Sequence, residues 1–388
     1  MRAEPGSQGR VHVLAIGGAH QFAHILPVAR ELEARRPGSV SVFVCSPAEA
    51  DEARVQMQQG WSGPIPQVVV MRLPGGVVLP GRIDKTARLL VWARRLCRAG
   101  AILCAERTST LLRRIVPGCP PIVHIPHGAG DRAVGFEKRF MVFDRVLVAG
   151  RKDRDRLVAS GFVKPQACVV TGPVKLATIL STAPTRSALF ANDRPTILYN
   201  PHFAQAHSSL AAFGQKLVEA VVRDGRWNLV VAPHVRLARG WSDAQRAVWE
   251  ALAVPGQVMI DLGSPRSSDM TYTLGADLYV GDVSSQVYEF LVRPRPCLFV
   301  NAHGVDWQGS EDYAMWRFGE VIAPDADPVA AIVRAFAGHA SYLSWQRDRM
   351  AYAIEGIAWD VDGMPCFPGL DPVARAADEV ERFTLKPT

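Results

Sequence analysis

The fold class that the sequence predicts is α/β, with two facing, Rossmann-like, doubly wound domains built on parallel sheets. Three observations predict it. The chain has 388 residues, a length that ordinarily divides into two or three domains. Short runs rich in Val and Ile alternate with amphipathic stretches, which is typical of βαβ units. A polar, aperiodic stretch at residues 181–194 separates two blocks of similar size.

The first block contains six apolar runs, each bounded by Gly, Pro or Ser, which is typical of strands buried on both faces. These expected strands are Val11–Gly17, Val40–Cys45, Gln67–Leu73, Ala101–Ala105, Pro121–Ile125 and Arg145–Ala149. The clearest helix between them is Phe22–Arg35, where apolar residues recur every three or four positions on one face.

The second block repeats the alternation of strands and helices. Its expected strands are Thr196–Tyr199, Asn228–Ala232, Gln257–Asp261, Asp277–Val280 and Cys297–Val300. Its expected helices are Ser208–Arg223, Asp243–Leu252, Ser284–Val292 and Pro328–Ala337. The chain is thus expected to form an N-terminal domain at 1–180, a linker at 181–194, a C-terminal domain at 195–370 and a closing helix in 371–388. The family resemblance described below implies that the first is the acceptor-side domain and the second is the nucleotide-donor domain.

Composition excludes several protein classes. Hydrophobic residues make up 48% and charged residues 21% of the chain, as in ordinary globular proteins. No apolar run approaches the roughly 18 residues of a membrane-spanning helix, and the first ten residues lack the apolar core of a signal peptide. The seven cysteines show no CxxC spacing, so we expect reduced, mostly buried thiols and a cytoplasmic protein.

The charge balance is basic, with a net charge of +7 and a pI of about 9.2. This surplus is compatible with a phosphorylated substrate or with peripheral association at the inner face of a membrane. No segment combines clustered basic residues with interleaved aromatic residues, so nucleic acid is not an expected partner.

Ligands of doubly wound folds bind at the carboxyl ends of the strands, so residues that directly follow strands are the candidates for a site. Gly17 and Gly18 follow the first strand and precede His20. Glycines there let the backbone approach a ligand. The dinucleotide fingerprint GxGxxG and the P-loop pattern are both missing. Two interpretations of these residues stay open, contact with the acceptor and plain turn geometry.

Three histidines follow strands of the two blocks. His127, before Gly128, ends the fifth run of the first block, and a histidine there can take a proton from an attacking hydroxyl. His202 follows Asn200 and Pro201, and His234 follows the next strand. These two can bind a phosphate or support a leaving group. Their wide spacing in the sequence does not indicate a metal site.

The most specific pattern runs from Gly281 to Leu291 and reads GDVSSQVYEFL. A strand leads into Asp282, Ser284 and Ser285, and a helix is expected to follow. Serine caps and the positive end of that helix would form an anion site suited to a diphosphate. Gln286 opens the helix, and Glu289 lies one turn into it, where a carboxylate can accept bonds from ribose hydroxyls.

The stretch Asp-x-Ser-Ser-x-x-x-x-Glu-Phe at 282–290 resembles the Asp-Tyr-Ser-Ser motif of the CDP-glycerol glycerophosphotransferases, the teichoic-acid primase and polymerase family. The His-Gly at 127–128, the Tyr-Asn-Pro at 199–201 and the Pro-His at 233–234 resemble further elements of that family in the same order. The resemblance covers roughly residues 110–335. It implies a GT-B fold and metal-independent transfer of glycerol phosphate from CDP-glycerol, with release of CMP.

The resemblance also implies roles for individual residues. His127 would be the base that activates the acceptor, and His234 would bind the donor diphosphate and stabilise the departing CMP. Ser284 and Ser285 would bind donor phosphates, with Asp282 holding their loop. Glu289 would lie near the ribose. The expected partners are a nucleotide-activated donor and a glycan or lipid-linked acceptor, and no cofactor or metal is expected.

Three alternatives remain open at this point. The same fold serves glycosyltransferases that use a nucleotide sugar in surface polysaccharide synthesis. It also serves nucleotide-sugar 2-epimerases, although the loop after His127 lacks the Glu-Ala-Gly-Leu-Arg element of those enzymes. A non-catalytic nucleotide-binding protein would tolerate replacement of the three histidines without loss of binding.

Overall fold

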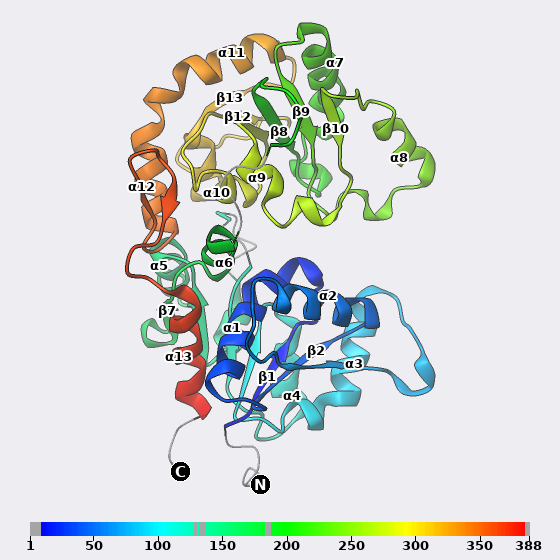
Figure 1. The fold of residues 1–388 in the computed structure, drawn as a ribbon, viewed down its shortest axis with the longest axis vertical. Coiled ribbons are helices and arrows are strands. Elements are labelled where there is room, and N and C mark those ends of the chain that lie inside the picture. Colours follow the sequence, from blue (N-terminus) through cyan, green and yellow to red (C-terminus); the bar gives the residue numbers. More distant parts are fainter. Residues whose placement is uncertain (1–8, 128–129, 132–136, 183–187, 385–388) are drawn as a thin grey trace.

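The computed structural model describes residues 9–127, 130–131, 137–182 and 188–384. It contains two parallel β-sheets, each flanked by helices, in two bodies that lie one above the other in Figure 1. We call the body around the first sheet the N-lobe and the body around the second sheet the C-lobe. The predicted α/β class with two doubly wound parallel sheets is confirmed.

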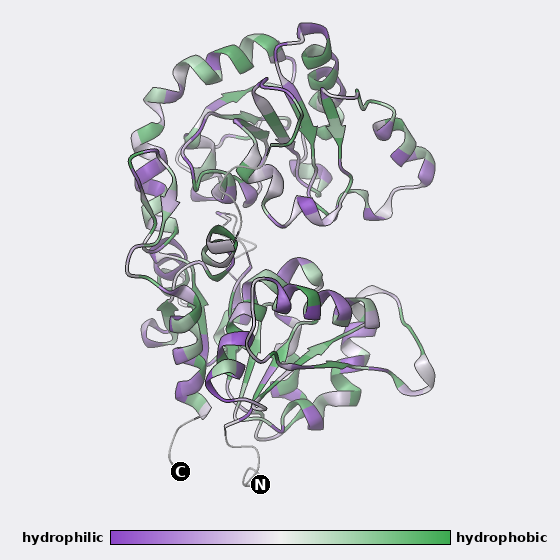
Figure 2. Cartoon of the chain, in the orientation of Figure 1, coloured by the Kyte–Doolittle hydropathy of each residue, from purple (hydrophilic) through white to green (hydrophobic). Residues whose placement is uncertain are grey.

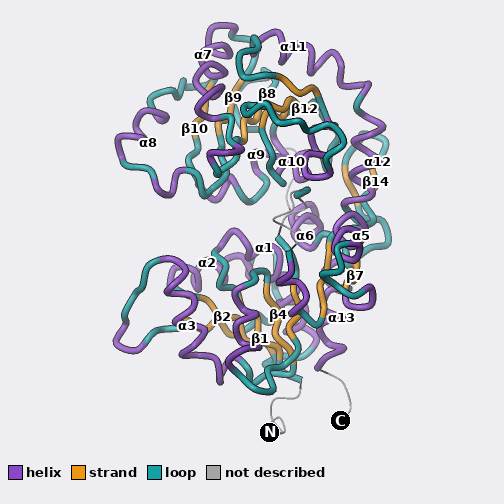
Figure 3. The backbone as a smooth tube through the Cα atoms, turned by 180° about the vertical axis from the view of Figure 1, so that it is seen from behind, coloured by secondary structure: helices purple, strands orange, loops and turns teal. Residues whose placement is uncertain are grey.

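The N-lobe sheet has seven parallel strands in the order β3-β2-β1-β4-β5-β6-β7. Their bounds are β1 Val11–Leu14, β2 Val40–Val44, β3 Gln67–Val70, β4 Ala101–Cys104, β5 Ile122–His124, β6 Arg145–Val148 and β7 Cys168–Val170. The central strands β1 and β4 are buried along their whole length because helices cover both faces of the sheet (Figure 3). The six expected strands are present, and each is shorter than its predicted range.

The helices of this lobe are α1 Phe22–Arg35, α2 Pro47–Gln58, α3 Gly81–Leu96, α4 Leu112–Ile115, α5 Arg151–Ala159 and α6 Val174–Thr182. The prediction of α1 is confirmed at both ends. Its apolar stripe, which includes Phe22, Ile25 and Leu26, is buried, and the helix packs beside α2 and α6. The expected linker begins where α6 ends, and residues 183–187 within it lie outside the described part of the chain.

The C-lobe sheet has six parallel strands in the order β10-β9-β8-β11-β12-β13. They are β8 Thr196–Asn200, β9 Asn228–Val231, β10 Val258–Ile260, β11 Leu278–Gly281, β12 Cys297–Val300 and β13 Glu320–Ile322. A two-stranded antiparallel hairpin, β14 Ala358–Trp359 with β15 Pro365–Cys366, lies apart from it. The sequence analysis missed β13, because a three-residue edge strand carries too little alternation to stand out.

The C-lobe helices and the closing helix are α7 Gln215–Asp224, α8 Asp243–Glu250, α9 Thr271–Gly275, α10 Gln286–Phe290, α11 Pro328–Gly338, α12 Leu343–Ala353 and α13 Pro372–Thr384. Two predicted helices need correction. The helix expected at Ser208–Arg223 begins with a π-helical turn at Leu210–Gly214. The helix expected at Ser284–Val292 is only α10, which begins two residues later and ends two residues earlier than predicted.

The chain returns to the N-lobe at its end. Helix α12 leaves the C-lobe and packs beside α5, and α13 lies against α1 (Figure 1). At the first of these contacts Gly150 is so close to the end of α12 that a Cβ atom would overlap the backbone of Ala353 and Ile354. The two lobes are therefore joined by packing of returning helices as well as by the 183–195 connection.

A buried carboxylate also joins the lobes. Asp131, which is 1% exposed, accepts hydrogen bonds from Lys152 of α5 at 2.8 Å and from the Tyr288 hydroxyl of α10 at 2.7 Å. Arg349 of α12 lies 3.4 Å from the same carboxylate. Although burial disfavours the ammonium group, nearby Tyr288, Asp153 and Asp131 raise the pKa of Lys152 above its usual value. The network thus places a charged pair between the lobes.

Within the described residues, the structure contains no helix that is both long and apolar enough to cross a membrane. The hydropathy colouring agrees, since green and purple residues alternate along the helices of both lobes (Figure 2).

Substitution Gly150→Ala should lower the free energy of unfolding by about 1–3 kcal/mol, because the added methyl group must push α12 away from α5. Urea-induced unfolding followed by circular dichroism measures the change. The matched control is Gly338→Ala at the end of α11, where a Cβ atom meets no neighbour within 4 Å. It should leave stability unchanged or slightly raised. Equal stability of the two variants would contradict this packing.

Candidate active site between the lobes

His127 follows β5 at the carboxyl edge of the N-lobe sheet. Its Nδ1 lies 3.0 Å from the carbonyl oxygen of Ala105. A carbonyl only accepts, so Nδ1 carries the ring proton and Nε2 carries the lone pair. The side-chain amide of Gln21 lies within 3.4 Å of the same ring. His127 is therefore held in one orientation by groups that follow β4 and β1.

The glycine turn after β1 makes the Gln21 contact possible. A Cβ atom on Gly17 would overlap the Gln21 side chain, and Gly18 has a φ of 111°, which a residue with a side chain rarely adopts. His20 lies beside them, with its ring 6.0 Å from that of His127 between centroids. The predicted residues Gly17, Gly18 and His20 thus lie next to His127, whereas Gly128 is outside the described residues.

On the C-lobe, the ends of β8 and β9 bring two further histidines together. The His202 and His234 rings lie 6.2 Å apart between centroids, and the Phe203 ring lies 4.8 Å from that of His234. The backbone N–H of His234 donates to the Pro201 carbonyl at 3.1 Å. Asn200 is buried and donates to the Ala232 carbonyl at 2.7 Å, so in this structure its amide joins β8 to β9.

Titratable groups of each lobe lower the pKa values of histidines on the other lobe. Burial, and then Arg236, Arg239 and His127, lower the pKa of His234 to about 4. Burial, and then His127 together with the same arginines and His234, lower the pKa of His20 to about 3. Burial also lowers the pKa of His127, and Arg236 of the opposite lobe adds to the effect. These imidazoles are neutral at neutral pH in the structure without ligand.

A cavity of 470 Å³ lies between the lobes beside this cluster. Helices α1, α2 and α6 line one side of it, and the loops after β9 and β10 line the other. Among its lining residues are His20, Arg30, Glu52, Thr178, Arg239 and Ser264. The cavity thus reaches the histidine cluster at His20 and carries arginines from both lobes.

The loop after β11 carries the most specific sequence pattern. One carboxylate oxygen of Asp282 accepts from the backbone N–H of His202 at 2.8 Å and of Ser209 at 3.0 Å. Its other oxygen is buried and has no hydrogen-bond partner among the described residues. Burial raises the pKa of Asp282 to about 6. Asp282 therefore ties the loop after β11 to the loop after β8.

The two serines occupy different environments. Ser284 is buried, and its Oγ accepts from the Gln286 backbone N–H at 3.3 Å. Ser285 sits at the start of α10 without a side-chain capping bond. A Cβ atom on Gly130 would lie 3.3 Å from that of Ser285, so the loop that follows His127 meets the serine loop. Because α10 has only five residues, its dipole is weaker than the predicted longer helix would provide.

Glu289 is paired with a residue of the N-lobe. Its Oε1 lies 2.6 Å from Lys175 Nζ on α6, while its Oε2 is buried without a hydrogen-bond partner among the described residues. The proposed ribose contact stays a prediction, and Oε2 is the oxygen left to make it. Gln286, by contrast, directs its amide to the Ser267 carbonyl in the loop before α9.

Several residues of the site were missed from sequence alone: Gln21, Asp131, Lys175, Arg236, Arg239 and Tyr288. The arginines carried a usable signal, since they follow His234 by two and five positions. Within the described ranges, no three His, Cys, Asp or Glu side chains gather as a metal site would need. The absence of a metal from the reaction stays a prediction.

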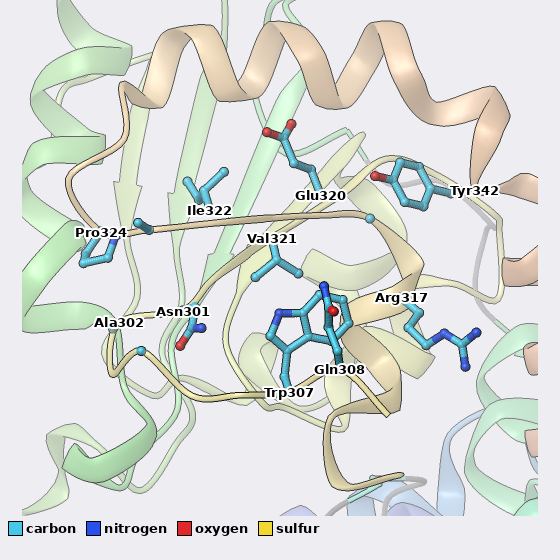
Figure 4. Close-up of a pocket in the computed structure, with 13 residues that line it drawn as sticks. Asn301, Ala302, Trp307, Gln308, Arg317, Glu320, Val321, Ile322, Pro324 and Tyr342 are labelled. Carbon is cyan, nitrogen blue, oxygen red and sulfur yellow. The ribbon is translucent and has the colours of Figure 1, made fainter. Parts of the chain in front are cut away.

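A second cavity, of 750 Å³, lies along the free edge of β13 (Figure 4). Trp307 and Gln308 lie below this strand, and Glu320 and Tyr342 lie above it. Asn301 closes the adjoining loop, because its side chain exchanges hydrogen bonds of 2.8 and 2.9 Å with the Val305 backbone. This cavity shares no lining residue with the cavity between the lobes.

Comparison with known proteins shows the fold. No protein-family model matches the chain, and no curated protein matches it in sequence. Among solved structures, a putative UDP-N-acetylglucosamine 2-epimerase from Listeria monocytogenes is 14% identical, with a TM-score of 0.61 over 96% of this chain and 95% of that one. The wall teichoic acid polymerase TagF is 11% identical, with a TM-score of 0.62 over 97% and 89%.

A third similar structure is the UDP-GlcNAc 2-epimerase from Neisseria meningitidis bound to UDP-GlcNAc. It is 11% identical, with a TM-score of 0.56 over 97% of this chain and 100% of that one. These likenesses extend over nearly the whole chain, including both lobes. The protein therefore has the GT-B fold.

The lowered pKa values predict that acid destabilises the protein. Below pH 6.5 the unfolded chain binds protons at His20 and His234, whereas the folded chain does not until about pH 3 and pH 4. The unfolded state then holds more protons, so the free energy of unfolding should fall as the pH drops from 6.5 to 4. Urea unfolding at constant ionic strength measures it.

Two substitutions separate the contributions of His234 and Asp282 to this pH dependence of the free energy of unfolding. His234→Gln should flatten the decline, because one proton-binding difference is removed. Asp282 acts in the opposite direction: its raised pKa of about 6 makes the folded state bind a proton before the unfolded state does. Asp282→Asn should therefore steepen the decline. Stability that does not change between pH 6.5 and pH 4 would contradict the buried, neutral histidines.

Proposed function

We propose that the protein transfers glycerol phosphate from CDP-glycerol to a hydroxyl of a cell-surface glycan or lipid-linked acceptor and releases CMP. The observation that carries the proposal is one cavity lined by His20, which lies beside His127 on one lobe, and by Arg239 of the other lobe. Besides burial, Arg236 lowers the pKa of His127 and His127 lowers the pKa of His234 across the cleft. A base and a set of cations on opposite walls of one cleft suit the transfer of an anionic group to a hydroxyl.

His127 is suited to be the base. The Ala105 carbonyl holds the proton on Nδ1, so the lone pair is on Nε2. The Gln21 side-chain amide donates to that lone pair at 3.4 Å, and the acceptor hydroxyl would take the place of this donor. The lowered pKa of His127 keeps the ring neutral at pH 7, and Gln21 fixes its direction. The acceptor hydroxyl would give its proton to Nε2 while its oxygen bonds to the β-phosphorus of the donor.

The C-lobe cations are suited to the leaving group. The bond from the β-phosphorus to the bridging oxygen breaks, and CMP departs with the negative charge. Arg239 lines the cavity between the lobes, and Arg236 and Arg239 both lower the pKa of His234. A bound diphosphate reverses that effect, because an anion favours the imidazolium. His234 would then donate a hydrogen bond to the departing phosphate.

The similar structures support a nucleotide-activated donor. TagF is a wall teichoic acid polymerase, and one of its structures was obtained with CDPG soaked in. The epimerase from Neisseria meningitidis holds UDP-GlcNAc. The GT-B fold is common to these proteins and to this chain, and in this proposal the side chains described above would supply positive charge to a diphosphate. Sugar transfer from a nucleotide sugar would use the same base and cations.

The first test is ligand-induced stabilisation. CDP-glycerol and CMP should raise the melting temperature of the purified protein, because a ligand that binds only the folded state stabilises it by mass action. UDP-sugars and GDP-sugars should raise it less. Stabilisation by a UDP-sugar or a GDP-sugar alone would contradict the glycerophosphate donor and favour sugar transfer.

Substitution His127→Asn should lower the rate of acceptor-dependent CMP release by about 10²–10⁴-fold, the usual contribution of a general base. Binding of CDP-glycerol should change little, because His127 faces the acceptor. His234→Asn should weaken donor binding as well as slow the release of CMP. The matched control is His339→Gln, between α11 and α12, which keeps a polar group beside Gln346. Undiminished CMP release by His127→Asn would refute the assigned base.

A further inference from the structure

One segment of the N-lobe exposes an unusual amount of apolar side chain. Five large aliphatic residues between positions 77 and 91 are exposed: Val77 at 51%, Val78 at 80%, Ile83 at 61%, Leu90 at 52% and Val91 at 53%. Contiguous apolar surface of this kind marks an interaction site in a soluble protein. We call these five residues, together with Arg94, Arg95 and Arg98, the docking surface.

Helix α3 is apolar on both of its sides. Leu89 and Leu96 are completely buried and pack into the lobe's core. Ile83 and Leu90, two turns apart, lie together on an exposed flank about 100° around the helix from that buried stripe, and Val91 lies opposite the stripe. A helix on the surface of a globular protein ordinarily has polar residues opposite its buried stripe. Packing within the lobe therefore does not account for the outer face of α3.

The loop before α3 holds its two valines away from the lobe. Gly75 and Gly76 have φ values of 68° and 71°, and this left-handed pair turns the chain where a side chain would be strained. The backbone N–H of Leu79 donates to Asp84 Oδ1 at 3.1 Å, which fastens the loop to α3. Figures 1 and 3 both show the loop extending beyond the helices of the lobe.

The charge on this surface is positive. Arg94, Arg95 and Arg98 are exposed at the end of α3 and in the turn that follows. The one acidic residue of α3 is Asp84, which is bonded to Arg88 at 2.6 Å and so neutralised locally. An apolar face flanked by exposed arginines is complementary to a layer that is apolar inside and anionic at its surface.

We propose that the docking surface binds an anionic phospholipid bilayer. The valines at the loop tip enter the boundary between headgroups and acyl chains. Helix α3 lies along the interface with Ile83 and Leu90 toward the lipid, and the arginines contact lipid phosphates. This binding depends on neither His127 nor a nucleotide donor.

The valine loop of the docking surface and His127 lie at the same edge of the N-lobe sheet, so a bound bilayer would be near the candidate active site. The loop leaves the carboxyl end of β3, and His127 follows β5 at the same edge of the sheet. Four strand spacings separate β3 from β5, a distance of about 19 Å. A bilayer at the docking surface therefore lies beside the cleft, within reach of the headgroup of a lipid-linked acceptor. Only this step rests on the proposed function.

Vesicle flotation of the full chain tests the proposal. The protein should float with vesicles of phosphatidylcholine mixed with phosphatidylglycerol, and much less with vesicles of phosphatidylcholine alone. The double variant Val77→Ser/Val78→Ser should bind the mixed vesicles about tenfold more weakly or worse, because apolar area no longer leaves water. Arg94→Gln/Arg98→Gln should lose roughly fivefold in affinity for each arginine removed.

The controls are substitutions of equally exposed residues on the C-lobe. Val248→Ser on α8 removes a valine that is 55% exposed, and Arg223→Gln on α7 removes an exposed arginine. Both should bind vesicles as the unchanged protein does. Equal binding by all variants, or no binding to mixed vesicles, would overturn the proposal. A dimer in solution that the double valine variant abolishes would also overturn it, by assigning the surface to a second copy.

The same variants separate this proposal from the proposed function. Stabilisation by CDP-glycerol should persist in Val77→Ser/Val78→Ser while vesicle binding is lost. Vesicle binding without any stabilisation by CDP-glycerol would leave the docking surface intact and refute the donor.

Discussion

The buried carboxylate of Asp131 is the interaction on which the arrangement of the two lobes depends. It belongs to the loop after β5, yet its partners are Lys152 of α5, Tyr288 of α10 and Arg349 of α12. Removing one partner from a buried charge pair typically costs about 3–5 kcal/mol. The lobes therefore cannot part at this point without leaving a charge uncompensated.

The hydrogen bonds of Asp131 also hold the loop after β5 close to the loop after β11. His127 lies four residues before Asp131 in the same loop, and Ser285 lies three residues before Tyr288. The contact between Gly130 and Ser285 is the result. The Lys175–Glu289 pair adds a second link from α6 to α10. The loop of His127 on one lobe and the serine loop on the other are thus held together by contacts on both sides.

The charge of the cleft and the composition of the docking surface suit the two ligands that we propose for them. The cleft holds neutral histidines and arginines from both lobes, and the carboxylates of Glu52 and Asp269 also line its cavity. The valine loop of the docking surface leaves the same edge of the N-lobe sheet, and the arginines of this surface lie at the far end of α3, just before β4 begins. In our proposals an anionic, water-soluble donor and an acceptor at a membrane surface approach the cleft from two sides, which explains why the two kinds of surface adjoin.

The sequence by itself determined the fold class, the buried strands and the strand-end positions of His127, His202 and His234, because apolar periodicity and glycine or proline punctuation are local properties. It indicated Asp282 and the two serines for the same reason. Only the tertiary structure decided that Asp131 holds Tyr288, that Gln21 holds His127, and that Lys175 pairs with Glu289. Those partners are about 100 to 160 residues apart in the chain. No local pattern encodes a contact between side chains that meet only after two lobes have folded and packed.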